Sequence, residues 1–115
     1  MTVVQYILLR SDLSFSRGAV IAQACHSSVY SIEKYRNHPD TIEYLENIES
    51  MAKIILKIKE KDVEEIAGYL TSKGIDHTVW IEDPERIPTC ISLRPYKRSH
   101  IPDVVDYLAR FGLFR

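Results

Sequence analysis

The first ten residues contain the pattern that most restricts how this chain can fold. Residues 3–9, VVQYILL, are apolar at both odd and even positions except for Gln5. A strand with one covered face alternates apolar and polar side chains, so this continuous run predicts a central strand covered on both sides.

The next segment predicts a turn and then a helix with two different faces. Residues 11–18, SDLSFSRG, are rich in turn formers, and from residue 19 to about residue 37 the apolar spacing becomes helical. At about 100° per residue, one stripe of this helix is partly polar and a second is mostly apolar. The first stripe holds Ala19, Gln23, His26 and Tyr30, and the second holds Val20, Ile21, Ala24, Ser28 and Ile32.

The remaining elements follow from the same periodicities. They are a short helix over 41–48, a strand over 53–59, a helix capped by Asp62 and running to Lys73, strands over 77–82 and 89–93, and a final helix over 99–111. The order β-α-α-β-α-β-β-α predicts a single domain, residues 1–115, of the α/β class. We expect a three-layer sandwich with a four-stranded, mixed but mostly parallel sheet and helices on both faces.

Right-handed crossovers place the first three strands parallel, and the fourth then returns antiparallel. The carboxyl ends of the parallel strands share one edge, where open α/β sheets form their sites. This edge is expected to bring together Asp12, the start of the first helix, Glu82, Asp83 and Thr89.

Composition excludes some classes of function. Cys25 and Cys90 are isolated, so we expect no structural zinc, no disulfide and no bound metal, and we expect Cys25 to lie on the packing side of its helix. The apolar start is too short for a membrane span and has no basic leader, which predicts a soluble, cytoplasmic protein. The net charge of −1 neither favours nor excludes a nucleic-acid partner.

Several residues at the expected edge are candidates for chemistry. Backbone amides near Arg17 and Gly18, at a helix start, suit an anion, although an ordinary loop is the alternative. His26 can act as an acid or a base, and a purely structural role is the alternative. Gln23 can orient a water or a carbonyl group, against a supporting polar role.

Two further candidates come from the later strands. Asp83 or Glu82 can act as a general base or polarise a bond. The alternative is that the carboxylate is only solvated. Thr89 can donate a hydrogen bond to a developing oxyanion, against a role in the strand alone. The densest basic cluster, residues 94–98 (RPYKR), is expected at the far end of the last strand, where it can contact a polyanion or simply be solvated.

The segment VVQYILLRSDLSFSRGAVIAQACHSS resembles the opening of the second, archaeal and eukaryotic type of peptidyl-tRNA hydrolase, in which a strand ending R-x-D-L precedes a G-K-x-A-x-Q-x-x-H helix. KIILKIK, TCISLRP and the LARFGLFR tail follow in matching order. QACH, HTVWIEDPE and TCISLRPY are more similar still to the divergent branch called peptidyl-tRNA hydrolase domain-containing protein.

The resemblance implies a hydrolase that cleaves the ester between a peptide and the terminal ribose of tRNA without a cofactor or metal. It implies tRNA as partner, and a homodimer is an assembly it allows. By position in the motifs, the catalytic residues it implies are Gln23, His26, Asp83, with Glu82 as a one-residue alternative, and Thr89. The substrate-binding residues are Asp12, Arg17, Gly18 and Lys59.

The sequence departs from the family at two places in this site. The motif lysine is replaced by Ala19, and the acidic loop before Thr89 is short, so one family threonine has no counterpart. The expected function is a peptidyl-tRNA hydrolase in which Asp83 or His26 is the general base. The alternative is a noncatalytic relative that binds RNA or a protein and has lost the lysine.

Overall fold

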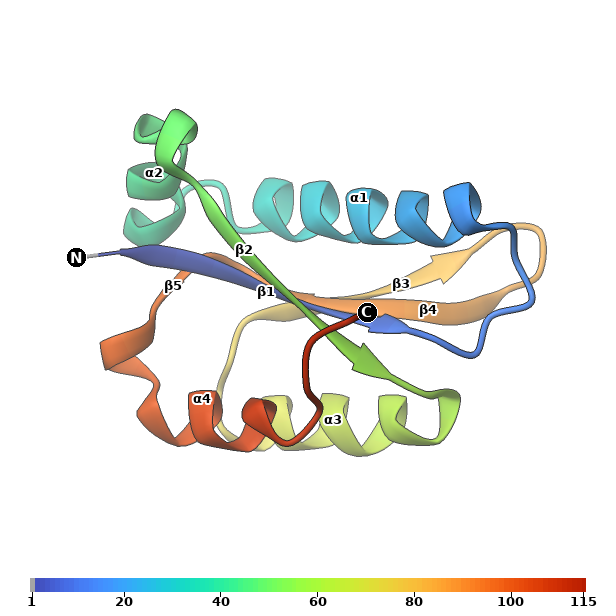
Figure 1. Cartoon of the computed structure of the whole chain (residues 1–115). Coiled ribbons are helices and arrows are strands. Elements are labelled where there is room, and N and C mark those ends of the chain that lie inside the picture. The colour runs from blue at the N-terminus through green and yellow to red at the C-terminus, as the bar shows by residue number, and fades with distance from the viewer. Residues whose placement is uncertain (1) are drawn as a thin grey trace.

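The computed structural model describes residues 2–115, which form a sheet with helices packed on both faces (Figure 1). The elements in chain order are β1 Val3–Arg10, α1 Arg17–Lys34, α2 Pro39–Glu46, the 3-10 turn Ile48–Ser50, β2 Ala52–Ile58, α3 Glu60–Ser72, β3 His77–Glu82, β4 Ile87–Leu93, β5 Tyr96–Lys97, the 3-10 turn Arg98–His100 and α4 Pro102–Ala109.

The sheet has the order β2-β1-β4-β3, and the short β5 pairs with the start of β1. β1 and β2 are parallel, with Leu8 opposite Leu56, whereas β4 is antiparallel to both β1 and β3. β3 therefore runs in the same direction as β1 and β2. This arrangement confirms the predicted mixed sheet with an antiparallel fourth strand, and β5 is an addition to it.

The helices divide into two layers. α1 and α2 lie on one side of the sheet, and α3 and α4 lie on the other (Figure 1). The larger apolar core lies under α3 and α4 and includes Leu8, Ile66 and Leu108, all fully buried. A smaller apolar cluster, including Ile7 and Cys90, faces α1. Every residue of β1 is buried, as the apolar run at 3–9, interrupted only by Gln5, predicts.

Gln5, the one polar residue in that run, is fully buried and fully engaged. Its Nε2 donates to the backbone oxygens of Ser28 and Leu93, and its Oε1 accepts from the Ser28 hydroxyl at 2.6 Å and from Lys53 Nζ at 2.7 Å. Burial lowers the pKa of Lys53. The central strand tolerates Gln5 because each of its polar atoms has a partner.

Several element boundaries differ from the predicted ones, and three helix starts have a clear local cause. The last helix begins at Pro102 instead of residue 99, since residues 98–100 form a separate 3-10 turn. α3 begins at Glu60, so Asp62 is its third residue instead of its cap, and Asp62 accepts from the Lys59 backbone N–H at 2.9 Å. α2 begins at Pro39, two residues early, because His38 caps it through a hydrogen bond from Asp40 N–H.

The prediction that Cys25 is buried is wrong, because its side chain is exposed. α1 packs against the sheet through small and polar residues, among them Ala24, Ser27 and Ser31. These positions turn Cys25 toward the outer side of the helix. Cys90, on β4, is buried, and burial raises the pKa of its thiol to about 12.

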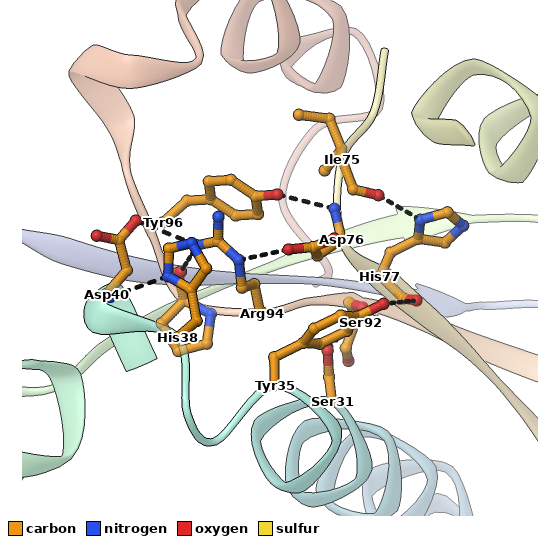
Figure 2. Close-up of polar contacts among 11 residues, drawn as sticks. Ser31, Tyr35, His38, Asp40, Ile75, Asp76, His77, Ser92, Arg94 and Tyr96 are labelled. Carbon is orange, nitrogen blue, oxygen red and sulfur yellow. Dashed lines mark hydrogen bonds and ion pairs between the residues drawn. The ribbon is translucent and has the colours of Figure 1, made fainter. Parts of the chain in front are cut away.

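A buried ion-pair cluster, which we call the Arg94 cluster, joins the ends of four elements far from the carboxyl edge (Figure 2). Arg94 is buried and pairs with Asp76 at 2.8 Å and with Asp40 at 3.1 Å. Its guanidinium also donates to the backbone oxygen of Pro95 and stacks on the ring of Tyr96, 3.6 Å from the ring centre. Arg94 is therefore a structural residue and not part of a solvated basic patch.

Candidate functional site at the carboxyl edge of the sheet

The start of α1 lies at the sheet edge where β1 ends, beside the turn that joins β3 to β4 (Figure 1). Ser16 ends the loop in an extended conformation, and its hydroxyl accepts from the Ala19 N–H at 3.2 Å. This cap fixes the first turn of the helix. The amides of Arg17 and Gly18 have no partner within the helix, because the first turn leaves its N–H groups unpaired.

Gln23 is the centre of the site. Its side chain lies in the second turn of α1, is only 1 % exposed and points toward β3 and β4. Nε2 donates to Glu82 Oε2 at 3.1 Å and to the Ala19 backbone oxygen at 3.2 Å, and Oε1 accepts from the Thr89 hydroxyl at 2.9 Å. The amide is therefore held in one orientation by three separate elements of the fold.

Thr89 reaches Gln23 because the strand pairing is irregular at this point. Trp80 pairs with Cys90, but the next residue, Ile81, pairs with Pro88, so Thr89 is the extra residue of a β-bulge on β4. In a regular strand, adjacent side chains point to opposite faces of the sheet. Cys90 faces α1, so Thr89 would then point away from α1. The bulge instead directs the Thr89 hydroxyl to the same side of the sheet.

The structure separates the two acidic candidates. Glu82, half-buried at the end of β3, accepts from Trp80 Nε1–H at 3.0 Å as well as from Gln23. Asp83 is 75 % exposed and pairs with Arg86 at 2.8 Å. The donors on Glu82, first Trp80 and then Gln23, hold the pKa of its carboxyl below its ordinary value, and the charge of His26 adds to this effect.

His26 lies at the open side of the site. Its ring is exposed and packs on Trp80 at 5.1 Å between ring centres, with the planes tilted by 35°. The sequence did not single out Trp80, although residues 80 and 82 share one face of a strand, which was the available signal. The site thus consists of Gln23, Glu82, Thr89, Trp80 and His26.

The predicted substrate-binding residues lie around this centre without contacting it. Arg17 and Gly18 are exposed in the first turn of α1. Asp12 accepts from Arg10 Nε at 2.9 Å and from the Glu60 N–H at 3.0 Å, and these bonds outweigh its burial and lower its pKa. Lys59 follows β2, three strand spacings or roughly 14 Å across the sheet from β3.

Among residues 2–115, no cluster of three or more His, Cys, Asp or Glu residues has the arrangement of a metal site. In the same range, no helix combines the length and the apolar character that crossing a membrane requires.

The acid titration of Glu82 tests this geometry. Because the fold lowers the pKa of Glu82, the ionised carboxylate adds to the free energy of unfolding at any pH above the ordinary carboxyl pKa. This contribution is lost as the pH falls through the lowered pKa. Trp80→Phe removes the first donor and keeps an aromatic ring, so the pKa of Glu82 should rise toward its ordinary value. Carbon-13 NMR titration of the Glu82 carboxyl measures the shift. Tyr30→Phe, which alters another ring on Trp80, should leave the titration unchanged; an unchanged titration in Trp80→Phe contradicts the assignment.

The fold and the site define an α/β sandwich protein with a polar site at the carboxyl edge of its sheet. Residues 3–111 match the family model described as Peptidyl-tRNA hydrolase PTH2, and the chain belongs to this family.

Curated relatives agree with this membership. The chain is 43% identical to a mouse protein named "Putative peptidyl-tRNA hydrolase PTRHD1", over 98% of this chain and 83% of the relative. It is 36% identical to the protein named "Peptidyl-tRNA hydrolase" of Methanococcus vannielii, over 90% of this chain and 95% of the relative. A third relative, from Methanothermobacter thermautotrophicus and with the same name, is 33% identical over 79% of this chain and 84% of its own length.

Proposed function

We propose that this chain hydrolyses the ester bond between a peptide and the 3′ ribose of tRNA, in the cytoplasm. Family membership and the names of the archaeal relatives support an ester hydrolase that acts on tRNA. The observation that carries the proposal is the buried Gln23 amide, which is bound to Thr89 on one side and to Glu82 on the other, at the carboxyl edge of the sheet.

The contacts of Gln23 and Thr89 suit positioning instead of direct chemistry. Both hydrogens of the Gln23 amide are donated within the fold, and the Thr89 hydroxyl is fully buried and donates to Gln23. Neither side chain is free to meet a substrate atom. We therefore assign both as positioning residues that fix the Glu82 carboxylate.

Glu82 and His26 then act together on the attacking water molecule. Donors to a carboxylate stabilise its anion, so Glu82 is a good acceptor of a hydrogen bond from water but a weak base. His26 takes the proton as the water oxygen attacks the ester carbonyl carbon. The first-turn amides of α1 at Arg17 and Gly18, about 12 Å along the helix from His26, bind a phosphate group of the tRNA end. The ester C–O bond then breaks, and His26 returns the proton to the ribose oxygen.

The direct test is hydrolysis of N-acetyl-aminoacyl-tRNA by the purified protein. We expect turnover in the wild type and a loss of about a hundredfold in Gln23→Ala, because the carboxylate loses its anchor. Ile21→Ala, an exposed change on the same helix, is the matched control. Salt-dependent tRNA binding without turnover in the wild type would instead establish the noncatalytic alternative, which Ala19 favours.

Ala19→Lys should raise the turnover by about tenfold or more. Ala19 lies one helical turn before Gln23, and an ammonium group there would stabilise the oxyanion or hold the tRNA end. Ala19→Met has a similar length without the charge and serves as the control. Equal rates for Ala19→Lys and the wild type would show that another group already supplies what the family lysine supplies.

A further inference from the structure

A second feature of the site is an open hollow on the outer side of α1, beside β3. It has a volume of about 500 Å³ and is lined by Cys25, His26, Val29, Tyr30, Glu33 and Trp80. Val29 is 67 % exposed and Tyr30 is 45 % exposed, so apolar surface faces water here. We call this feature the aromatic hollow.

The wall of the aromatic hollow is rigid. The Trp80 ring is held from one side by His26 and meets the edge of Tyr30 at 5.8 Å, with the ring planes at 78°. Its Nε1–H is bonded to Glu82 Oε1 at 3.0 Å, which prevents the ring from turning. A group bound in the hollow would therefore contact the same indole that fixes the Glu82 carboxylate.

The charges around the aromatic hollow determine which part of a peptidyl-tRNA can bind in it. Glu82, at the site end of the hollow, repels phosphate groups, and Glu33 in the lining is paired with Arg36 at 3.1 Å. The lining itself contains no Lys or Arg. Exposed cations without a carboxylate of the hollow beside them are Arg17 in the first turn of α1, Lys57 on the opposite edge strand, β2, and Lys59 just after it. The RNA backbone is thus favoured on the β2 side, and an uncharged, apolar group is favoured in the hollow.

We propose that the aromatic hollow binds the side chain of the amino acid esterified to the tRNA and makes the enzyme prefer large apolar residues at that position. This inference rests on the proposed function. The hollow adjoins Glu82, and its volume is ample for one aromatic side chain. The substrate would then cross the site, with the RNA toward β2 and the peptide over β3.

The kinetic test compares N-acetyl-phenylalanyl-tRNA with N-acetyl-glycyl-tRNA. We expect the wild type to favour the phenylalanyl substrate in kcat/KM by about tenfold or more, and Tyr30→Ala to reduce this ratio severalfold. Ile21→Ala, exposed on the same helix but outside the hollow, should keep the wild-type ratio. Turnover of both substrates at equal rates would overturn the proposal and leave the hydrolase function standing.

A binding test makes the inference independent of turnover. Trp80 is the single tryptophan of the chain, so its fluorescence reports on the hollow. N-acetylphenylalaninamide should change this fluorescence in a saturable way, and N-acetylglycinamide and AMP should not. A response to AMP alone would place the terminal adenosine in the hollow and overturn the proposal, as would no response to any of the three. A response to the phenylalanine compound without any tRNA hydrolysis would overturn the proposed function and retain the hollow.

Discussion

We expect Glu82→Gln to lower the turnover of N-acetyl-aminoacyl-tRNA by about a hundredfold or more, and Asp83→Asn to change it by less than about twofold. Glu82 is bonded to both Trp80 and Gln23, and only its ionised form accepts from both donors and still binds a water. A glutamine at this position keeps the size, loses the charge and presents an N–H group to one of the donors.

Comparing Glu82→Gln with Asp83→Asn decides which of the two neighbouring carboxylates acts in the reaction. The Asp83 side chain points to Arg86 and is 75 % exposed, so its charge should matter little at the site. Circular dichroism and melting temperature verify that both variants remain folded. A large loss in Asp83→Asn with an active Glu82→Gln would restore the residue that the motif position favours and would refute the geometry of the proposal.

We expect Arg94→Met to reduce the free energy of unfolding by about 3–5 kcal/mol. The substitution leaves Asp40 and Asp76 without their buried partner, and removing one member of a buried ion pair leaves an uncompensated charge. It also removes the stacking on Tyr96. Urea unfolding followed by circular dichroism gives the value, and Arg98→Met, which changes an exposed arginine four residues away, should cost less than about 0.5 kcal/mol.

A double-mutant cycle assigns the loss to the ion pair. Asp40→Asn removes the charge that faces Arg94, and the double variant should lose less stability than the sum of the two single losses, by about 0.5–3 kcal/mol. Additive losses would show that Arg94 stabilises the fold through packing and its backbone contact to Pro95 instead.

The pattern of the chain was enough to predict the layers and the strand directions. The apolar run at 3–9, interrupted only by Gln5, predicts a strand buried on both sides, and β1 is buried at every residue. The helical spacing places Gln23 and His26 on one stripe, and in the structure both contact residues of β3. These features depend on periodicity, which is a local property of the sequence. The roles of the site residues stay predictions until the activity of the variants is measured.

Periodicity was a weaker guide to the ends of the helices and to the exposure of individual side chains. Cys25 was expected in the core, but α1 packs through serines and alanine, so apolar character alone did not identify the packing face. The basic cluster at 94–98 gives no sign that Arg94 is buried, because its partners, Asp40 and Asp76, are distant in sequence. Long-range pairing of this kind leaves no periodic signal.

The sequence by itself determined the order of elements, the central strand and the helix that carries Gln23. Only the tertiary structure decided which side chains meet Gln23. The bulge on β4 turns Thr89 toward α1, and the end of β3 presents Glu82, not Asp83, to the buried amide. The physical reason is that side-chain direction in a sheet depends on register, and register is set by pairing between strands that are far apart in the chain.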